Sequence, residues 1–270
     1  MPPIPLAHSM DRTALTAPKI SLATLLALVF AMAASAAEAQ HCAEERFENA
    51  NYVVCTLDPA AADLRLFWKN AAGEAHRSFA SVAAAVASED RQLVFAMNAG
   101  MYQSDFSPVG LYVEGGAQLI PPNLRTVEGP ARQVPNFYKR PNGVFYFGAA
   151  GAGILPTEEF VAAQLDVAFA TQSGPMLVID NELHPALIPG STDRTRRSGV
   201  GVCEGSQVRF AISNDGVNFH DFARLFRDRL ACPNALFLDG GSGVGLFSPQ
   251  LGRNDFSWHG GFGPIVGLVD

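Results

Sequence analysis

Short apolar runs separated by glycine, proline and asparagine turns fill most of the chain after residue 40. Some runs alternate apolar and polar residues, which is typical of half-buried strands, and others are continuously apolar, as expected of buried strands. Strands are expected at 52–57, 64–68, 93–97, 143–147, 200–203, 207–212 and 235–238, and hairpins at 110–120 and 176–183.

Three segments predict helices, at 79–88, 157–164 and 219–230. The last repeats apolar residues at the spacing of an amphipathic helix, and Thr157 is the expected N-cap of the second. The proline-rich stretch 121–141 has no periodicity, and a loop of this length is often the lid or rim of a site. Strands with a minority of helices predict an α+β fold of mixed, largely antiparallel sheets with a few packed helices in a single domain.

The N-terminal region has the order of a secretory signal peptide. A weakly basic start precedes an apolar run at 21–34, and an A-x-A cleavage site follows at 37–39. The alternative is an uncleaved anchor, but the run is shorter than the roughly 20 residues that span a bilayer. We expect a signal peptide at 1–39 and a secreted or periplasmic domain at 40–270 with no membrane span.

The formal net charge of the chain is −7. There is no basic run or aromatic-basic stripe of the kind that binds phosphate backbones, so a nucleic-acid partner is not expected. An acidic surface does not exclude an anionic small molecule or glycan, because one or two local arginines suffice to bind a phosphate.

The four cysteines of an exported chain favour disulfides, and three pairings exist. Local geometry favours Cys42–Cys55 and Cys203–Cys232. No C-x-x-C pair occurs and the histidines are scattered, so no metal site is expected.

Three strand ends followed by glycine are the places where chemistry is expected, at 95–102, 172–176 and 238–242. Glycine there lets the backbone approach a ligand closely, although the same sequences also form ordinary turns. Asp239 ends an apolar strand, so its carboxyl should be partly desolvated. Among the arginines before the strand at 200–203, Arg197 is nearest the strand and is expected to point into the cleft.

Other motifs narrow the chemistry. His184 and His220 are further acid–base candidates, although His220 fits a capping or packing position at the start of a helix. No G-x-S-x-G elbow, P-loop or H-E-x-x-H occurs, which argues against the commonest esterase, nucleotidase and metalloprotease sites.

Several motifs, in order, resemble the phosphodiester glycosidase family. They are Asn98-Ala-Gly-Met-Tyr102 with Pro108–Glu114, Pro141–Phe145, Gln172–Met176, Arg197–Gly201 and Ala235–Ser242, over roughly residues 50–268. The form of the chain is most similar to the short exported bacterial branch of the family.

The resemblance implies an exported hydrolase that cleaves the glycosidic bond of a sugar-1-phosphodiester, typically of N-acetylglucosamine. In this hypothesis Arg197 holds the phosphate, Asp239 stabilises oxocarbenium character or directs water, and Asn98 shapes the cleft as the third member of the catalytic set. The expected substrate-binding residues are Gly100, Ser173, Gly174, Asn214, Gly240, Gly241 and Ser242.

Two other functions fit the same residues. A non-catalytic envelope protein could bind phosphate-linked glycans, and a phosphodiesterase on the same scaffold could cut P–O instead of C–O. No resident cofactor is expected, but a magnesium ion held mostly by substrate oxygens would leave little trace in a sequence.

Overall fold

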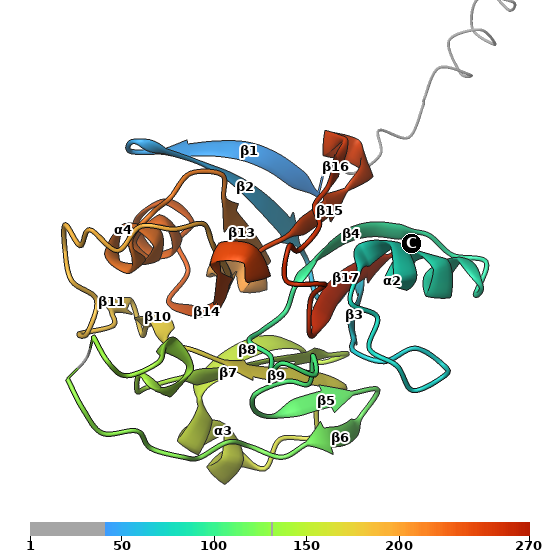
Figure 1. Ribbon diagram of the computed structural model, residues 1–270, viewed down its shortest axis with the longest axis horizontal. Coiled ribbons are helices and arrows are strands. Elements are labelled where there is room, and N and C mark those ends of the chain that lie inside the picture. The colour runs from blue at the N-terminus through green and yellow to red at the C-terminus, as the bar shows by residue number, and fades with distance from the viewer. Residues whose placement is uncertain (1–40, 131) are drawn as a thin grey trace, which may run out of the picture. The chain divides into compact units, whose positions relative to one another are not determined.

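The computed structural model describes residues 41–130 and 132–270, so the expected signal peptide at 1–39 lies outside the described residues. Residues Gln40–Asp270 form one compact unit. Within the described part of this unit the chain has 17 strands and three α-helices, which confirms the α+β prediction (Figure 1). None of the helices found there is long and apolar enough to cross a membrane.

The largest sheet has seven strands, each antiparallel to its neighbours. In spatial order they are β1 (Cys42–Phe47), β2 (Ala50–Leu57), β13 (Val208–Ser213), β12 (Arg197–Val202), β14 (Asn234–Gly240), β10 (Met176–Ile179) and β11 (Glu182–Leu183). Both faces are buried: alternate residues of β2 such as Val53 and Tyr52 belong to two different cores. Burial on both faces explains why several strands are nearly continuous apolar runs.

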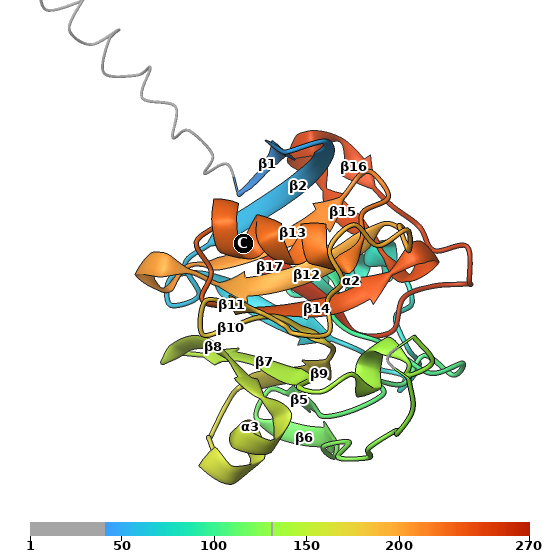
Figure 2. The ribbon, with the colours of Figure 1, turned by 90° about the vertical axis from the view of Figure 1, so that its left-hand side faces the viewer.

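Two five-stranded sheets complete the unit (Figures 1 and 2). One consists of β16 (Arg253–Asn254), β15 (Leu246–Ser248), β4 (Leu93–Asn98), β17 (Ile265–Val269) and β3 (Asp63–Phe67). The other consists of β6 (Ala117–Ile120), β5 (Tyr112–Glu114), β9 (Phe169–Ser173), β7 (Gly143–Gly148) and β8 (Gly151–Pro156). All three sheets contribute to one central core, to which Phe95, Phe145 and Phe210 each belong.

The helices cover the outer faces of the sheets. Helix α2 (Phe79–Ala87) packs on the sheet of β4, α3 (Thr157–Ala163) on the sheet of β7, and α4 (Phe219–Arg224) on the seven-stranded sheet (Figures 1 and 2). The short helical turns are η1 (Asn136–Tyr138), η2 (Glu204–Ser206), the π-helical η3 (Leu225–Arg229), η4 (Gly241–Gly243) and η5 (Pro249–Leu251).

One capping prediction is wrong. Thr157 is the first residue of α3 and Pro156 precedes it as the N-cap, without a side-chain capping bond. The Thr157 hydroxyl instead donates to Asn142 Oδ1 at 2.9 Å. A tertiary partner that lies far away in the sequence has therefore taken the hydroxyl that could have capped the helix.

Both expected disulfides are confirmed. Cys42 pairs with Cys55 across β1 and β2, and Cys203 pairs with Cys232, with sequence separations of 13 and 29 residues. The second bond ties the end of β12 to the segment that follows η3. Each closes a loop and so restricts the unfolded chain.

Replacing Cys203 and Cys232 with serine should lower the free energy of unfolding by about 3–4 kcal/mol. Replacing Cys42 and Cys55 should lower it by about 3 kcal/mol, because that bond closes a shorter loop. Urea denaturation of both double variants measures the difference. Unchanged stability after both replacements would show that the bonds do not form in the folded protein.

Candidate active site

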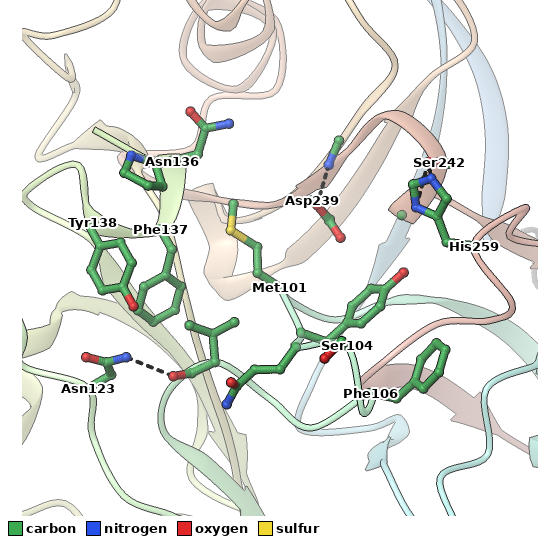
Figure 3. Close-up of a pocket in the computed structure, with 16 residues that line it drawn as sticks. Met101, Ser104, Phe106, Asn123, Asn136, Phe137, Tyr138, Asp239, Ser242 and His259 are labelled. Carbon is green, nitrogen blue, oxygen red and sulfur yellow. Dashed lines mark hydrogen bonds between the residues drawn. The ribbon is translucent and has the colours of Figure 1, made fainter. Parts of the chain in front are cut away.

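A cavity of about 830 Å³ lies where four segments of the chain meet (Figure 3). Its lining residues are Met101, Tyr102, Gln103, Ser104, Phe106, Val109, Asn123, Pro135, Asn136, Phe137, Tyr138, Asp239, Gly240, Ser242, Gly243 and His259. The volume is in the range of small-molecule sites. Part of the predicted rim, 121–141, does form one wall, through Asn123 and residues 135–138.

Asp239 supplies the carboxylate of this cavity. It follows the buried residues of β14, and its Oδ1 accepts a hydrogen bond from Gly240 N at 2.7 Å. A Cβ on Gly243 would collide with Oδ2, so the glycine makes room for the carboxylate. No ion pair to Asp239 occurs in the described part of the chain. Burial without a cation raises the pKa of Asp239 to about 7.

The backbone of Asp239 is held by a buried hydroxyl. Ser198 Oγ accepts from Asp239 N and donates to Asp239 O, both at 3.2 Å. Asn98 Nδ2 donates to Ser198 Oγ at 2.8 Å, and Asn98 Oδ1 accepts from Gly245 N at 3.2 Å. Asn98 therefore braces the strand ends behind Asp239, and it does not line the cavity.

The second predicted strand end also lies behind the cavity. Ser173 is fully buried and its hydroxyl donates to Leu238 O at 2.9 Å, next to Asp239. A Cβ on Gly174 would lie 2.6 Å from Asn142 Cβ, and one on Gly100 would lie 3.0 Å from Thr171 Oγ1. These contacts pack the loops together. Gly100, Ser173 and Gly174 were predicted to bind substrate, but none of them is among the lining residues.

Two side-chain amides in the family motifs, to which the sequence analysis gave no role in the site, hold the cavity wall. Gln172 Oε1 accepts from Asn123 N and its Nε2 donates to Asn123 O, both at 2.9 Å. Asn142 Nδ2 donates to Phe137 O at 2.8 Å. Gln172 of β9 and Asn142, which precedes β7, thus position the long loop that forms this wall.

The prediction that Arg197 points into the cleft is wrong. Its Nε donates to Val217 O at 2.9 Å, its Nη2 to Asp193 Oδ2 at 3.3 Å, and its guanidinium lies 3.7 Å from the Phe219 ring centroid. Successive side chains of a strand point to opposite faces. Because Ser198 faces Asp239, its neighbour Arg197 faces the core under α4, where burial lowers its pKa.

Asn214 does not lie at this cavity either. It lines a second, smaller cavity of about 370 Å³ beside β1 and β2, and its Oδ1 accepts from Arg253 Nη1 at 2.7 Å. Asn214 follows β13, which β12 separates from β14 and Asp239 in the sheet.

The three residues of the Gly-Gly-Ser turn after Asp239 have different roles. Gly240 and Ser242 line the cavity as predicted, but Gly241 does not; its φ of +66° and its bond from N to Arg196 O at 2.9 Å shape the turn. Ser242 Oγ lies 3.0 Å from a ring nitrogen of His259, a lining residue that the sequence reasoning missed (Figure 3).

Further lining side chains were also missed, notably Tyr102, Asn136 and Tyr138. His259 is followed by Gly260-Gly261, the same pattern that drew attention to Asp239. Among residues 41–130 and 132–270, no three His, Cys, Asp or Glu side chains gather as metal ligands. The lining therefore offers one carboxyl, one imidazole, and neutral polar and aromatic groups.

Comparisons with known proteins agree with the resemblance seen in the motifs. The family model described as phosphodiester glycosidase matches residues 91–261. The uncharacterized protein YigE of Escherichia coli (strain K12) is 34% identical over 185 residues, which cover 68% of this chain and 70% of YigE.

Two solved structures share the fold. The catalytic domain of zebrafish N-acetylglucosamine-1-phosphodiester alpha-N-acetylglucosaminidase, auto-inhibited by its pro-peptide, has a TM-score of 0.57 at 14% identity, over 84% of this chain and 81% of that one. A hypothetical protein from Synechocystis has a TM-score of 0.52 at 14% identity, over 84% of this chain and 61% of that one. At this identity they establish a common fold alone.

Replacing Arg197 with methionine should lower the free energy of unfolding by about 1–3 kcal/mol, because Val217 O loses one of its two donors and Asp193 loses its bonds to the guanidinium. The folded variant should keep its KM for a phosphodiester substrate, since Arg197 does not line the cavity. The exposed Arg194→Met is the matched control, with an expected change within about 0.5 kcal/mol. A raised KM at unchanged stability would return Arg197 to phosphate binding.

The free energy of unfolding of Asp239→Asn, relative to that of the wild type, should be higher at pH 8 than at pH 4. Folding raises the pKa of the Asp239 carboxyl from the ordinary 3.8 to about 7. The neutral carboxyl therefore contributes its full stability below the pKa of the unfolded protein, and this contribution is lost as the pH rises through the pKa of the folded protein. The wild type should lose about 2–4 kcal/mol relative to the variant over this window.

Urea denaturation of both proteins at pH 4 and pH 8 measures this difference, with the exposed Asp166→Asn as control. An equal difference between wild type and Asp239→Asn at both pH values would mean that the carboxyl is ionised in the folded protein at pH 4 already.

Proposed function

The chain belongs to the phosphodiester glycosidase family, and from that premise we propose that it is a hydrolase that cleaves the bond between C1 of a sugar and a phosphodiester oxygen. The observation that carries the proposal is the buried carboxyl of Asp239 in the cavity, whose pKa burial raises to about 7. The zebrafish enzyme that shares the fold is an N-acetylglucosamine-1-phosphodiester alpha-N-acetylglucosaminidase. We take N-acetylglucosamine as the sugar for this chain as part of the same proposal.

In this mechanism protonated Asp239 donates its proton to the phosphate oxygen as the C1–O bond breaks. The departing phosphate monoester has a second pKa of about 6. A carboxyl with a pKa of about 7 is therefore closely matched to it, and such matching makes general acid catalysis efficient near neutral pH.

The positive charge that develops at C1 fits the cavity lining. After proton transfer Asp239 is a carboxylate, and aromatic faces such as those of Phe137 and Tyr138 also favour a cation. Water then adds to C1, and either the Asp239 carboxylate or the His259 imidazole accepts its proton. Cleavage at P–O would instead gather negative charge beside Asp239, so the lining favours C–O cleavage.

Neutral donors take the place that the sequence analysis gave to Arg197. Asn136, Tyr138 and Ser242 line the cavity and carry N–H or O–H groups suited to phosphate oxygens. The lining contains no Arg or Lys side chain in the described part of the chain. Under this proposal, proton donation by Asp239 neutralises the negative charge on the departing phosphate, which a bound cation would otherwise offset.

We also propose that the enzyme acts outside the cytoplasm, in the periplasm or as a secreted protein. The apolar run and A-x-A sequence before residue 40 support export. The two disulfides support it too, because such bonds persist in oxidising compartments.

The test is turnover of N-acetylglucosamine 1-(methyl phosphate). The kcat/KM should be level at low pH and fall about tenfold per pH unit above pH 7, because the active form of Asp239 is protonated. Asp239→Asn should lower kcat by about 10²–10⁴-fold. Turnover that survives in the variant would remove Asp239 from the mechanism.

Hydrolysis in ¹⁸O-labelled water separates the alternatives. Label in the released sugar identifies C–O cleavage, and label in the phosphate identifies a phosphodiesterase. Binding without either product would identify a non-catalytic glycan-binding protein.

A further inference from the structure

Two large aromatic side chains stand in solvent on the loop between β16 and β17. Phe256 is 65% exposed and Trp258 is 82% exposed. Their rings contact each other edge to face, with centroids 4.7 Å apart and an interplanar angle of 63°. Contiguous apolar surface left in water is typical of a binding site, whereas single exposed apolar residues are ordinary.

The loop that carries these rings is fixed at both ends. Asp255 pairs with Arg253 at 2.8 Å and with Arg196 at 3.2 Å. At the other end, Arg77 Nη2 donates to Gly260 O at 2.6 Å, and Tyr102 Oη donates to Gly261 O at 3.0 Å. The two rings are therefore held out on an anchored backbone, and little conformational entropy remains to be lost when a ligand packs on them.

The rings adjoin the proposed active site. His259 follows Trp258 directly and lines the cavity with Ser242, and Tyr102, which anchors the loop, lines it too. Consecutive Cα atoms are about 3.8 Å apart, so the Trp258 Cα lies next to that of a lining residue, although neither ring itself lines the cavity.

The geometry points to a sugar-binding subsite formed by Phe256 and Trp258, which holds a further, uncharged sugar residue of the substrate. The C–H faces of a pyranose pack well on aromatic rings. The negative faces of the rings disfavour the phosphate itself. The subsite extends the proposed function, on which it rests: the substrate is an oligosaccharide or polymer that carries the phosphodiester, and not a single sugar.

Two other occupants fit less well. Anionic membrane surfaces attract basic segments, whereas this chain has a net charge of −7. A second copy of the chain would have to bury the rings together with the charged side chains that anchor the loop. Continuity with a glycosidase cavity therefore favours a glycan.

Fluorescence quenching tests binding without any need for turnover. The chain has two tryptophans, and Trp68 is 7% exposed, so iodide quenching reports on Trp258. The N-acetylglucosamine trimer at millimolar concentration should protect Trp258 from iodide, whereas inorganic phosphate should not. If the trimer, maltotriose and cellotriose all fail to protect Trp258, the subsite is wrong. It is also wrong if phosphatidylglycerol vesicles or a raised protein concentration protect Trp258 and the sugars do not.

Kinetics on two substrates give a second readout. Trp258→Ala should raise KM about tenfold for a trisaccharide methyl phosphodiester and leave KM for the monosaccharide phosphodiester unchanged. Trp258→Tyr should restore most of the loss. The exposed Ile188→Ala, at 55% exposure, is the matched control. Equal effects of Trp258→Ala on both substrates would contradict the subsite.

The two proposals fail separately. Sugar protection of Trp258 without any turnover would leave the subsite standing and overturn the hydrolase. Turnover of the monosaccharide phosphodiester without protection by any trisaccharide would do the reverse.

Discussion

The site depends on one carboxyl group that folding removes from water. Asp239 sits at the end of a buried strand, with Gly240 N as its hydrogen-bond donor and no ion-pair partner among the described residues. Withdrawal from water disfavours the charged form and raises the pKa of the carboxyl to about 7, so its protonated form is well populated at neutral pH. The glycine at 243 and the backbone bonds from Ser198 hold the carboxyl in this environment, and the remaining lining is arranged around it.

Most of the polar residues in the family motifs act behind the cavity. Asn98 and Ser198 fix the peptide of Asp239, Ser173 fixes Leu238 O, and Gln172 fixes the loop at Asn123. Asn98 and Ser173 join strands of different sheets, Ser198 joins two strands of one sheet, and Gln172 joins a strand to a loop. A buried polar group without a partner would be costly. The same motif residues therefore support both the fold and the site, because the strand ends meet at the cavity.

The sequence predicted elements with strong patterns and missed those without them. Helix α2 and strands β4 and β7 were predicted because their apolar runs are clear, whereas β1, with Glu44, Glu45 and Arg46, has the composition of a loop. Asp239 was found because it ends an apolar strand. Arg197 was misplaced because its face depends on strand register, which local sequence does not reveal. His259 was missed because its partner Ser242 lies 17 residues away.

Titration of the Asp239 carboxyl by carbon-13 NMR, assigned by comparison with Asp239→Asn, tests its role as proton donor most directly. We expect this carboxyl to titrate with a pKa of about 7, well above the ordinary 3.8. A carboxyl that titrates near 4 would be an anion at neutral pH, and it would contradict the role of Asp239 as the proton donor.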